Sequence, residues 1–123
     1  MIEAVLCLAM NIYHEARDQD LMGQMAVAEV TLNRVDSTRW PDSICEVVWQ
    51  DKQFSWTKDG KSDRMFEEDA RHLATSLARM YVYGELESFV THGATHYHAT
   101  FVNPYWADQL EKTTEIGTHV FYK

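Results

Sequence analysis

Residues 2–17, IEAVLCLAMNIYHEAR, decide the fold of this chain. Apolar side chains recur in this stretch at every third or fourth position, which is the spacing of one face of an α-helix. The pattern therefore predicts a helix whose apolar face packs on a protein core. That face is predicted to consist of Ile2, Val5, Leu6, Ala9, Met10 and Tyr13.

A second helix is predicted over residues 21–36, where small and apolar side chains repeat the same spacing. Residues 18–20 supply the turn between the two helices, and Asp20 has the type of side chain that caps a helix N-terminus. The predicted inner face of this helix consists of Met22, Met25, Ala26, Glu29, Val30 and Val35.

The middle of the chain is expected to form two further helices joined by a loop. A short helix is expected over residues 44–50, and a third long helix over 66–83, which Gly84 ends. Residues 51–64 show no regular period and are expected to form the loop. The inner face of the long helix is predicted to consist of Leu73, Leu77, Met80 and Tyr81.

The C-terminal part of the chain changes from helical to extended patterns. Residues 95–100 and 118–122 have the β-branched and aromatic content of short strands, and Ile116 with Gly117 marks a turn. We therefore expect a single α+β domain over residues 1–123, with a mainly helical body and a small C-terminal β-sheet or flap.

The composition is that of a globular protein, with 46% hydrophobic and 24% charged residues. The formal net charge of −8 argues against binding to nucleic acid or to an anionic membrane, because both need a cationic surface. No apolar run reaches the roughly 20 residues of a membrane span. The first residues lack the basic stretch of a secretory signal, so we expect synthesis in the cytoplasm unless an export signal lies outside this sequence.

The two cysteines, Cys7 and Cys45, stand in apolar surroundings. They lack the Cys-x-x-Cys spacing of a zinc site. We expect both to be small buried hydrophobic residues without a metal.

Glu15 falls at the C-terminal end of the first predicted helix, within residues 11–17. Cleavage of a glycosidic bond needs a carboxylic acid that is still protonated near neutral pH. Partial burial beside Tyr13 would raise the pKa of Glu15 toward that of such an acid. In the alternative interpretation, Glu15 is an exposed glutamate paired with Arg17 or His14 on a solvated face.

A polar and aromatic segment covers residues 50–56, QDKQFSW. Amide and hydroxyl groups beside aromatic rings are typical of a sugar-binding groove, in which the rings stack on pyranose faces. In the alternative interpretation, Phe54 and Trp56 form a hydrophobic plug that closes the core.

Three histidines, His92, His96 and His98, lie within seven residues and raise the hypothesis of a metal site. Together with His14 and Asp18, the last two are similar to the ligand set of zinc peptidoglycan endopeptidases. Such an enzyme would cut peptidoglycan at a peptide bond instead of a glycosidic bond. Scattered polar histidines without a metal are the alternative.

Short motifs follow one another in a fixed order along the chain. They are YHEAR (13–17), GQMAVA (23–28), LNRV (32–35), CEVV (45–48), QFSW (53–56), GATHYH (93–98) and IGTHVFY (116–122). Taken together, these segments resemble the SleB-type cell-wall hydrolase family, named for the spore-cortex lytic enzymes of germination. The resemblance covers about residues 4–122, and several motifs in order make it far more specific than one.

The resemblance implies a lysozyme- or transglycosylase-like body in which Glu15 acts as general acid and base. It implies that the partner is the peptidoglycan glycan strand, and that neither a metal nor another cofactor is needed. It implies a groove built from Gln53, Phe54, Ser55, His96 and Tyr97, with His119 close by. A histidine such as the last, between hydrophobic strand residues, more often closes a hydrogen bond in the core.

The reaction expected from the resemblance cuts between N-acetylmuramic acid and N-acetylglucosamine and leaves 1,6-anhydro-muramic acid ends. A hydrolase would need a second carboxylate instead, for which Asp18, Asp20 and Glu29 are the candidates. The rival classes are a zinc endopeptidase with His14, Asp18, His96 and His98 as ligands, and a wall-binding module without catalysis.

The sequence departs from the family pattern at residues 98–102, HATFV, where a different flap is expected. No separate peptidoglycan-binding segment is recognised. We therefore expect a monomeric catalytic domain that acts on the cell wall, as would suit a phage lysis enzyme or a small wall-remodelling enzyme.

Overall fold

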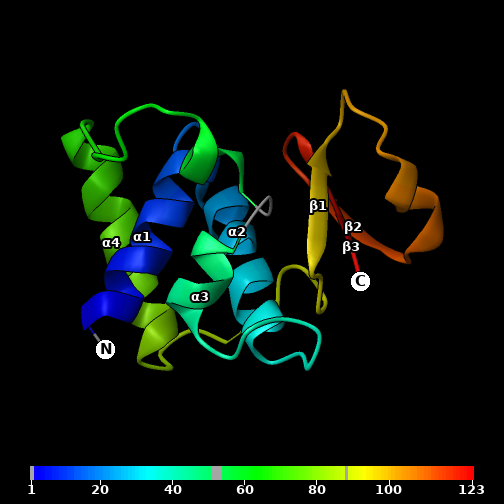
Figure 1. Ribbon diagram of the computed structural model, residues 1–123, viewed down its shortest axis with the longest axis horizontal. Coiled ribbons are helices and arrows are strands. Elements are labelled where there is room, and N and C mark those ends of the chain that lie inside the picture. Colours follow the sequence, from blue (N-terminus) through cyan, green and yellow to red (C-terminus); the bar gives the residue numbers. More distant parts are fainter. Residues whose placement is uncertain (1, 51–53, 88) are drawn as a thin grey trace.

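The computed structural model describes residues 2–50, 54–87 and 89–123, and it shows a helical body beside a small antiparallel sheet (Figure 1). The α+β class predicted from the sequence is therefore confirmed. The helices are α1 (Ile2–Ala16), α2 (Leu21–Val35), α3 (Ile44–Trp49) and α4 (Glu68–Val82), with the short 3-10 helices η1 (Ser55–Lys58) and η2 (Tyr105–Gln109). The strands are β1 (His96–Ala99), β2 (Lys112–Ile116) and β3 (His119–Tyr122). None of the helices in the described ranges is long and apolar enough to cross a membrane.

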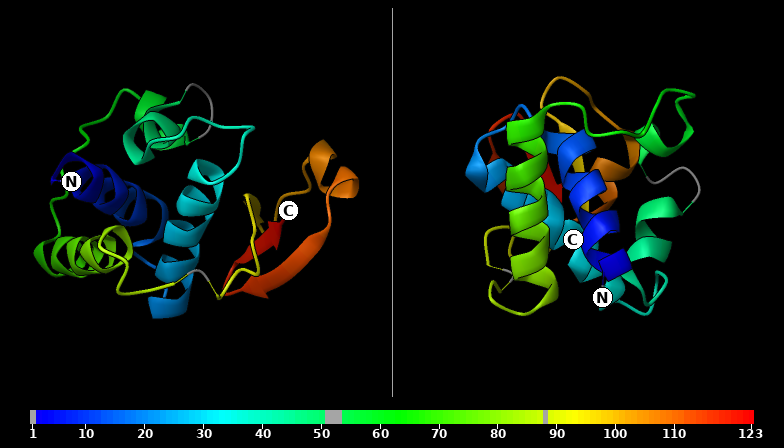
Figure 2. Two further views of the ribbon diagram at one scale, coloured as in Figure 1. Left: turned by 90° about the horizontal axis from the view of Figure 1, so that it is seen from below. Right: turned by 90° about the vertical axis from the view of Figure 1, so that its left-hand side faces the viewer.

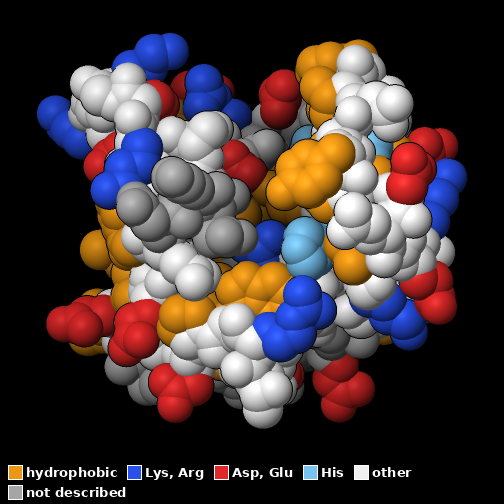
Figure 3. Space-filling model, turned by 45° about the vertical axis from the view of Figure 1, so that its right-hand side comes forward, with side chains coloured by type: hydrophobic (Ala, Val, Ile, Leu, Met, Phe, Trp, Pro, Cys, Tyr) orange, Lys and Arg blue, Asp and Glu red, His pale blue; other side chains and the backbone are white. Residues whose placement is uncertain are grey.

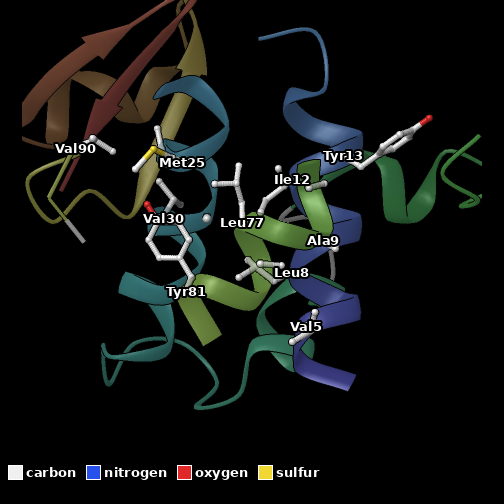
Figure 4. Packing of buried hydrophobic residues seen from close by; sticks show 14 of the residues in the cluster. Val5, Leu8, Ala9, Ile12, Tyr13, Met25, Val30, Leu77, Tyr81 and Val90 are labelled. Carbon is white, nitrogen blue, oxygen red and sulfur yellow. The ribbon is translucent and has the colours of Figure 1, made fainter. Parts of the chain in front are cut away.

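Helix α1 packs against α2, α3 and α4, so it is covered on several sides. The buried face is therefore wider than the apolar stripe predicted from the sequence. Leu8 and Ile12, which lie outside the predicted stripe, are fully buried, and Figure 4 shows Ile12 beside Leu77 of α4. Ile2 and Leu6 were wrongly placed in the core, since they are 83% and 52% exposed.

Helix α2 lies between the other helices and the sheet (Figure 2), and most of its side chains are buried. Asp20 caps it as predicted, because its side chain accepts a hydrogen bond from the backbone N–H of Gly23 at 3.1 Å. Most of the predicted inner face is buried, but Met22 is 45% exposed. The buried side chains include the charged residues Glu29 and Arg34.

Helix α4 packs on α1 along a narrow stripe. Leu77 and Tyr81 are buried as predicted, whereas Leu73 and Met80 are 41% and 37% exposed. The stripe follows the i, i+3, i+4, i+7 spacing of one helix face, and two alanines complete it. The predicted inner face was therefore rotated about the helix axis toward Leu73 and Met80, away from the two buried alanines.

The sheet has the antiparallel order β1-β3-β2. Strands β1 and β3 lie within the segments predicted from the sequence, but β2 was not predicted. Its sequence, KTTEI, lacks the apolar alternation of a half-buried strand, and none of its residues is fully buried. Strands β2 and β3 are joined by the predicted turn at Gly117, whose φ of +57° suits glycine.

The carboxylate of Glu29 is fully buried and holds the segment that leads from α4 to the sheet. It accepts hydrogen bonds from the backbone N–H groups of Phe89, Val90 and Thr91, at 2.9–3.0 Å. The hydroxyl groups of Thr91 and Tyr81 also donate to it. These donors compensate the burial of a charge, so Glu29 fixes the position from which the sheet starts.

Cys7 of α1 and Cys45 of α3 form a disulfide bond, with a Cα–Cα distance of 5.3 Å. The expectation of two free, buried cysteines was therefore wrong. Because α3 packs on α1, residues far apart in sequence come within the distance that a disulfide needs. The bond ties α3, and the chain that follows it, to the first helix.

Candidate active site

Glu15 lies in the last turn of α1, at the point where the helical body meets the sheet. The hydroxyl group of Tyr97, on β1, donates a hydrogen bond to Oε1 of Glu15. The glutamate is half-buried and is not paired with its neighbour Arg17, which forms an ion pair with Glu67 at 2.8 Å. The fold thus joins the predicted acid to one of the predicted groove residues.

The environment of Glu15 favours its protonated form. Burial raises the pKa of Glu15 above the usual value of a glutamate. The hydrogen bond from Tyr97 and the charges of Arg34 and His14 lower this pKa, but burial has the larger effect. Burial also raises the pKa of Tyr97 well above its usual value, so its hydroxyl remains a donor. A carboxyl group whose pKa is raised in this way suits a general acid.

Arg34 of α2 supplies a positive charge near Glu15. Its Nε donates a hydrogen bond to the backbone oxygen of Thr95 at 2.7 Å. Its guanidinium lies 5.4 Å from the ring centroid of Trp40 and 5.2 Å from that of Phe54. These contacts fix the cation between the helical body and the start of β1.

Phe54, an aromatic residue of the loop predicted to form the groove, presents almost no surface to solvent. Phe54 is only 2% exposed and packs with Val48 and Trp56, as the interpretation of a hydrophobic plug expects. Ser55 is exposed at the start of η1. Gln53 lies outside the described residues.

A row of half-buried aromatic rings extends from the sheet to the helical body. The ring of His96 on β1 lies 5.5 Å from Trp40, which follows α2, and 5.3 Å from Trp106 of η2. Figure 3 shows a hollow in which a histidine and a basic side chain lie among hydrophobic ones. Partly exposed rings beside a cleft are suited to stacking on sugar rings.

His119 on β3 stands behind Tyr97, with its ring centroid 5.0 Å from the tyrosine ring. Its Nδ1 is buried and has no hydrogen-bond partner in the described part of the chain. Burial lowers the pKa of His119, which favours the neutral ring. His119 therefore touches Tyr97, and through it the site of Glu15, but no contact with Glu15 itself is observed.

A polar pocket of about 310 Å³ opens beside His14, on the helical body. Nε2 of His14 forms a hydrogen bond with the backbone oxygen of Asp63 at 2.8 Å, and the ring stacks on Trp56 at 4.7 Å. The pocket is lined by Tyr13, His14, Arg17, Trp56, Asp59, Lys61, Ser62, Arg64, Phe66 and Glu67.

The residues of the alternative zinc site do not converge. Among the described residues, no three His, Cys, Asp or Glu side chains are grouped as metal ligands. His14 bonds Asp63 instead. The ring nitrogens of His98 bond the backbone oxygen of Ala99 at 2.7 Å and the hydroxyl of Tyr122 at 2.8 Å. In the described part of the chain, the ligands of the rival zinc hypothesis are therefore not gathered at one place.

Two of the three candidates for a second carboxylate have structural roles. Asp20 caps α2, and Glu29 is surrounded by the donors described above. Asp18 is exposed, and its charge acts on His119 by raising the histidine pKa. Unlike these three residues, Glu15 has a half-buried carboxyl group that accepts a hydrogen bond from a predicted groove residue.

Two residues of this region, Arg34 and Trp40, received no role from the sequence. Arg34 lies within the LNRV motif, and its position on a mostly apolar helix was the available signal. Trp40 precedes a proline, which indicated only an extended conformation. The contacts of Arg34 with Thr95 and Trp40, and of Trp40 with His96, depend on tertiary packing that local patterns do not contain.

Residues 18–122 match the family model described as cell wall hydrolase. The chain therefore belongs to the cell wall hydrolase family, and the predicted SleB-type relationship is confirmed. The matched residues begin just after Glu15. The chain is similar over 100% of its length to the catalytic domain of the germination-specific lytic transglycosylase SleB from Bacillus anthracis, with a TM-score of 0.81, 25% identity and 96% of that chain covered. The catalytic domain of Bacillus cereus SleB gives a TM-score of 0.78, also at 25% identity, with 91% of that chain covered.

Curated relatives include spore cortex-lytic enzymes. The one from Halalkalibacterium halodurans is 30% identical over 115 residues, which are 93% of this chain and 33% of the relative. The one from Bacillus subtilis is 38% identical over 64 residues, which are 52% of this chain and 21% of the relative. The aligned part thus spans a third or less of these relatives.

Proposed function

We propose that the chain cleaves the glycan strand of peptidoglycan and that Glu15 performs both proton transfers. The observation that carries this proposal is the half-buried carboxyl group of Glu15, held by the hydroxyl of Tyr97 where the helices meet the sheet. Membership of the cell wall hydrolase family supports the polymer as substrate. The similarity to the SleB catalytic domains supports residues 1–123 as one catalytic unit.

In the proposed reaction, protonated Glu15 donates its proton to the oxygen that links N-acetylmuramic acid to N-acetylglucosamine. The bond from this oxygen to the muramoyl C1 breaks, and positive charge develops at C1. The Glu15 carboxylate then accepts the proton of the muramoyl C6 hydroxyl, whose oxygen bonds to C1. The ring closes to the 1,6-anhydro form, no water is consumed, and Glu15 regains its proton.

The environment of Glu15 supports both of these roles. Burial favours the protonated carboxyl that starts the reaction, and the hydrogen bond from Tyr97 favours the carboxylate that completes it. An attacking hydroxyl that belongs to the substrate has the advantage of an intramolecular reaction. A second carboxylate on the other sugar face, as inversion requires, is then unnecessary.

The groove of this proposal consists of His96 and Tyr97, with Trp40 and Trp106 extending it as a row of rings. Ser55 is proposed to lie at its edge. Phe54 shapes the floor from within the core. His119 supports the ring of Tyr97.

The disulfide between Cys7 and Cys45 supports a site of action outside the reducing cytoplasm. Disulfides persist in oxidising compartments and are rare in cytosolic proteins of most organisms. The cell wall lies in such a compartment. The bond thus agrees with peptidoglycan as the substrate without identifying the route to it.

Turnover of purified peptidoglycan by wild type and Glu15→Gln tests the proposal. The variant is expected to lose at least about 10²–10⁴-fold in kcat, the range of one general acid–base group. Glu68→Gln is the matched control, because this exposed residue lies 3.7 Å from His72 on the surface of α4. Near-normal turnover by folded Glu15→Gln would overturn the role of Glu15, and loss of wild-type activity on chelation, with recovery on adding zinc, would favour the endopeptidase.

A further inference from the structure

The side chain of Arg34 is 4% exposed and forms no ion pair with any carboxylate in the described ranges. Its Nη1 is buried without a hydrogen-bond partner there. Burying an unpaired donor of a charged group costs free energy, and burial indeed lowers the pKa of Arg34. Such a group in a native protein requires an explanation.

Arg34 is held rigidly although its Nη1 is unpaired. The rings of Trp40 and Phe54 lie within 5.4 Å of the guanidinium carbon, and Nε donates to the backbone oxygen of Thr95. Because Thr95 leads into β1, the same strand holds Arg34 at its start and Tyr97 slightly further on. Packing and the Nε bond therefore prevent Arg34 from turning away from the site.

Arg34 interacts with Glu15 through its charge and not through an ion pair. The positive charge favours the carboxylate form of Glu15, and Glu15 favours the charged form of Arg34. A direct ion pair would hold Glu15 ionised and would leave it unable to donate a proton. A cation held close but unpaired allows Glu15 to be neutral first and then stabilises the anion.

We propose that Arg34 is a positioning residue whose fixed, unpaired guanidinium stabilises the carboxylate that Glu15 becomes after it donates its proton. This inference rests on the proposed function. The charge of the guanidinium acts on this carboxylate through space, because no ion pair joins the two described side chains. Arg34 thereby assists the first proton transfer, from Glu15 to the glycosidic oxygen, because a stabilised carboxylate makes the carboxyl group a better proton donor.

The other titratable groups that face Glu15 come from two elements. Tyr97 of β1 donates to its carboxylate, and His14 precedes it on α1. Both favour the ionised form of Glu15, as Arg34 does, while burial opposes them. Among these groups Arg34 is the one that carries a permanent charge.

The test compares Arg34→Gln, Arg34→Met and Arg34→Lys with wild type. The pKa of Glu15 is measured in the resting protein by ¹³C NMR of its carboxyl carbon, and kcat and KM are measured on peptidoglycan across pH. In the two neutral variants we expect a higher pKa of Glu15 and a kcat that is roughly 10- to 100-fold lower, with KM little changed. Arg34→Lys is expected to keep the pKa closer to that of wild type and to restore part of kcat.

Arg39→Gln is the matched control, because Arg39 also lies over the ring of Trp40, at 5.1 Å, but is not among the charges that act on Glu15. It should behave like wild type. Thermal unfolding verifies that each variant folds, and Arg34→Met carries the test if Arg34→Gln does not fold. An unchanged pKa of Glu15 in a folded neutral variant would overturn the inference, as would a lysine variant no more active than the neutral ones. Activity in Glu15→Gln would instead overturn the proposed function. The two failures can be told apart, because the NMR measurement of the Glu15 pKa does not depend on turnover.

Discussion

The hydroxyl group of Tyr97 donates a hydrogen bond to the carboxylate of Glu15 and thereby joins β1 to the end of α1. This bond favours the ionised form of Glu15, while burial favours the protonated form. A residue that acts first as an acid and then as a base needs both forms within reach of the working pH. The position of the sheet therefore influences the pKa of Glu15 at the end of α1.

Tyr97→Phe should raise the pKa of Glu15 further, because the donor to its carboxylate is lost. We expect kcat to fall roughly 10- to 100-fold, since a hydrogen bond to a charged group contributes about 1.5–3 kcal/mol. The limb of the pH–kcat profile that reports Glu15 should move to higher pH. Tyr122→Phe removes a hydroxyl that bonds His98 on the same sheet and serves as the control. An unchanged profile in folded Tyr97→Phe would show that the bond has no catalytic effect.

Glu15→Gln should alter stability in a pH-dependent way. Because the pKa of Glu15 is raised in the folded state, the stability supplied by its bound proton is fully present below the pKa of an unfolded glutamate, about 4.3. It is lost as the pH rises through the folded pKa. The unfolding temperature of the variant, relative to wild type, should therefore increase as the pH rises above about 4.3. A pH-independent difference, measured by calorimetry, would contradict a raised pKa.

Loss of the disulfide should lower stability without removing the site. In the loop-entropy model, a bond between cysteines separated by 38 residues contributes about 4 kcal/mol. Urea unfolding of Cys7→Ser with Cys45→Ser should therefore show a lower free energy of unfolding than oxidised wild type. Reductant should lower the stability of wild type and leave the double variant unchanged. Equal stability of the oxidised and reduced wild type would show that the bond contributes nothing.

Glu29→Gln should destabilise the fold by at least about 2 kcal/mol, because the amide cannot accept from all the backbone and hydroxyl donors around it. Its specific activity, corrected for the folded fraction, should be retained, because Glu29 anchors residues 89–91 and does not react. Chemical denaturation and turnover are measured on the same samples. A stable variant without turnover would restore Glu29 as a second catalytic carboxylate.

The helical body could be predicted from the sequence because its helices repeat apolar residues with a helical period. The buried faces were less predictable, since Leu8 is buried by contacts from several helices. Strand β2 was missed because Lys112–Ile116 is polar and is placed by pairing with β3. Backbone hydrogen bonding to a neighbouring strand does not require apolar alternation, so an edge strand of this kind has no such pattern in its sequence.

The candidate site could be predicted only in part. Glu15 was selected with the help of the family resemblance, because spacing alone also allowed an exposed ion pair. The hydrogen bond from Tyr97 to Glu15 and the placement of Arg34 beside β1 depend on the packing of the sheet on α1 and α2. The disulfide was missed for a similar reason, because nothing in the sequence around Cys7 shows that α3 crosses α1.

The central claim is tested most directly by mass spectrometry of the soluble products released from purified peptidoglycan. Wild type should release muropeptides with 1,6-anhydro-muramic acid ends, lighter by one water than hydrolysed products, and Glu15→Gln should release none. Reducing muramic-acid ends would require a water-activating base and would direct attention to Asp18. Cleaved stem peptides with intact glycan strands would contradict the claim that Glu15 cuts the glycan.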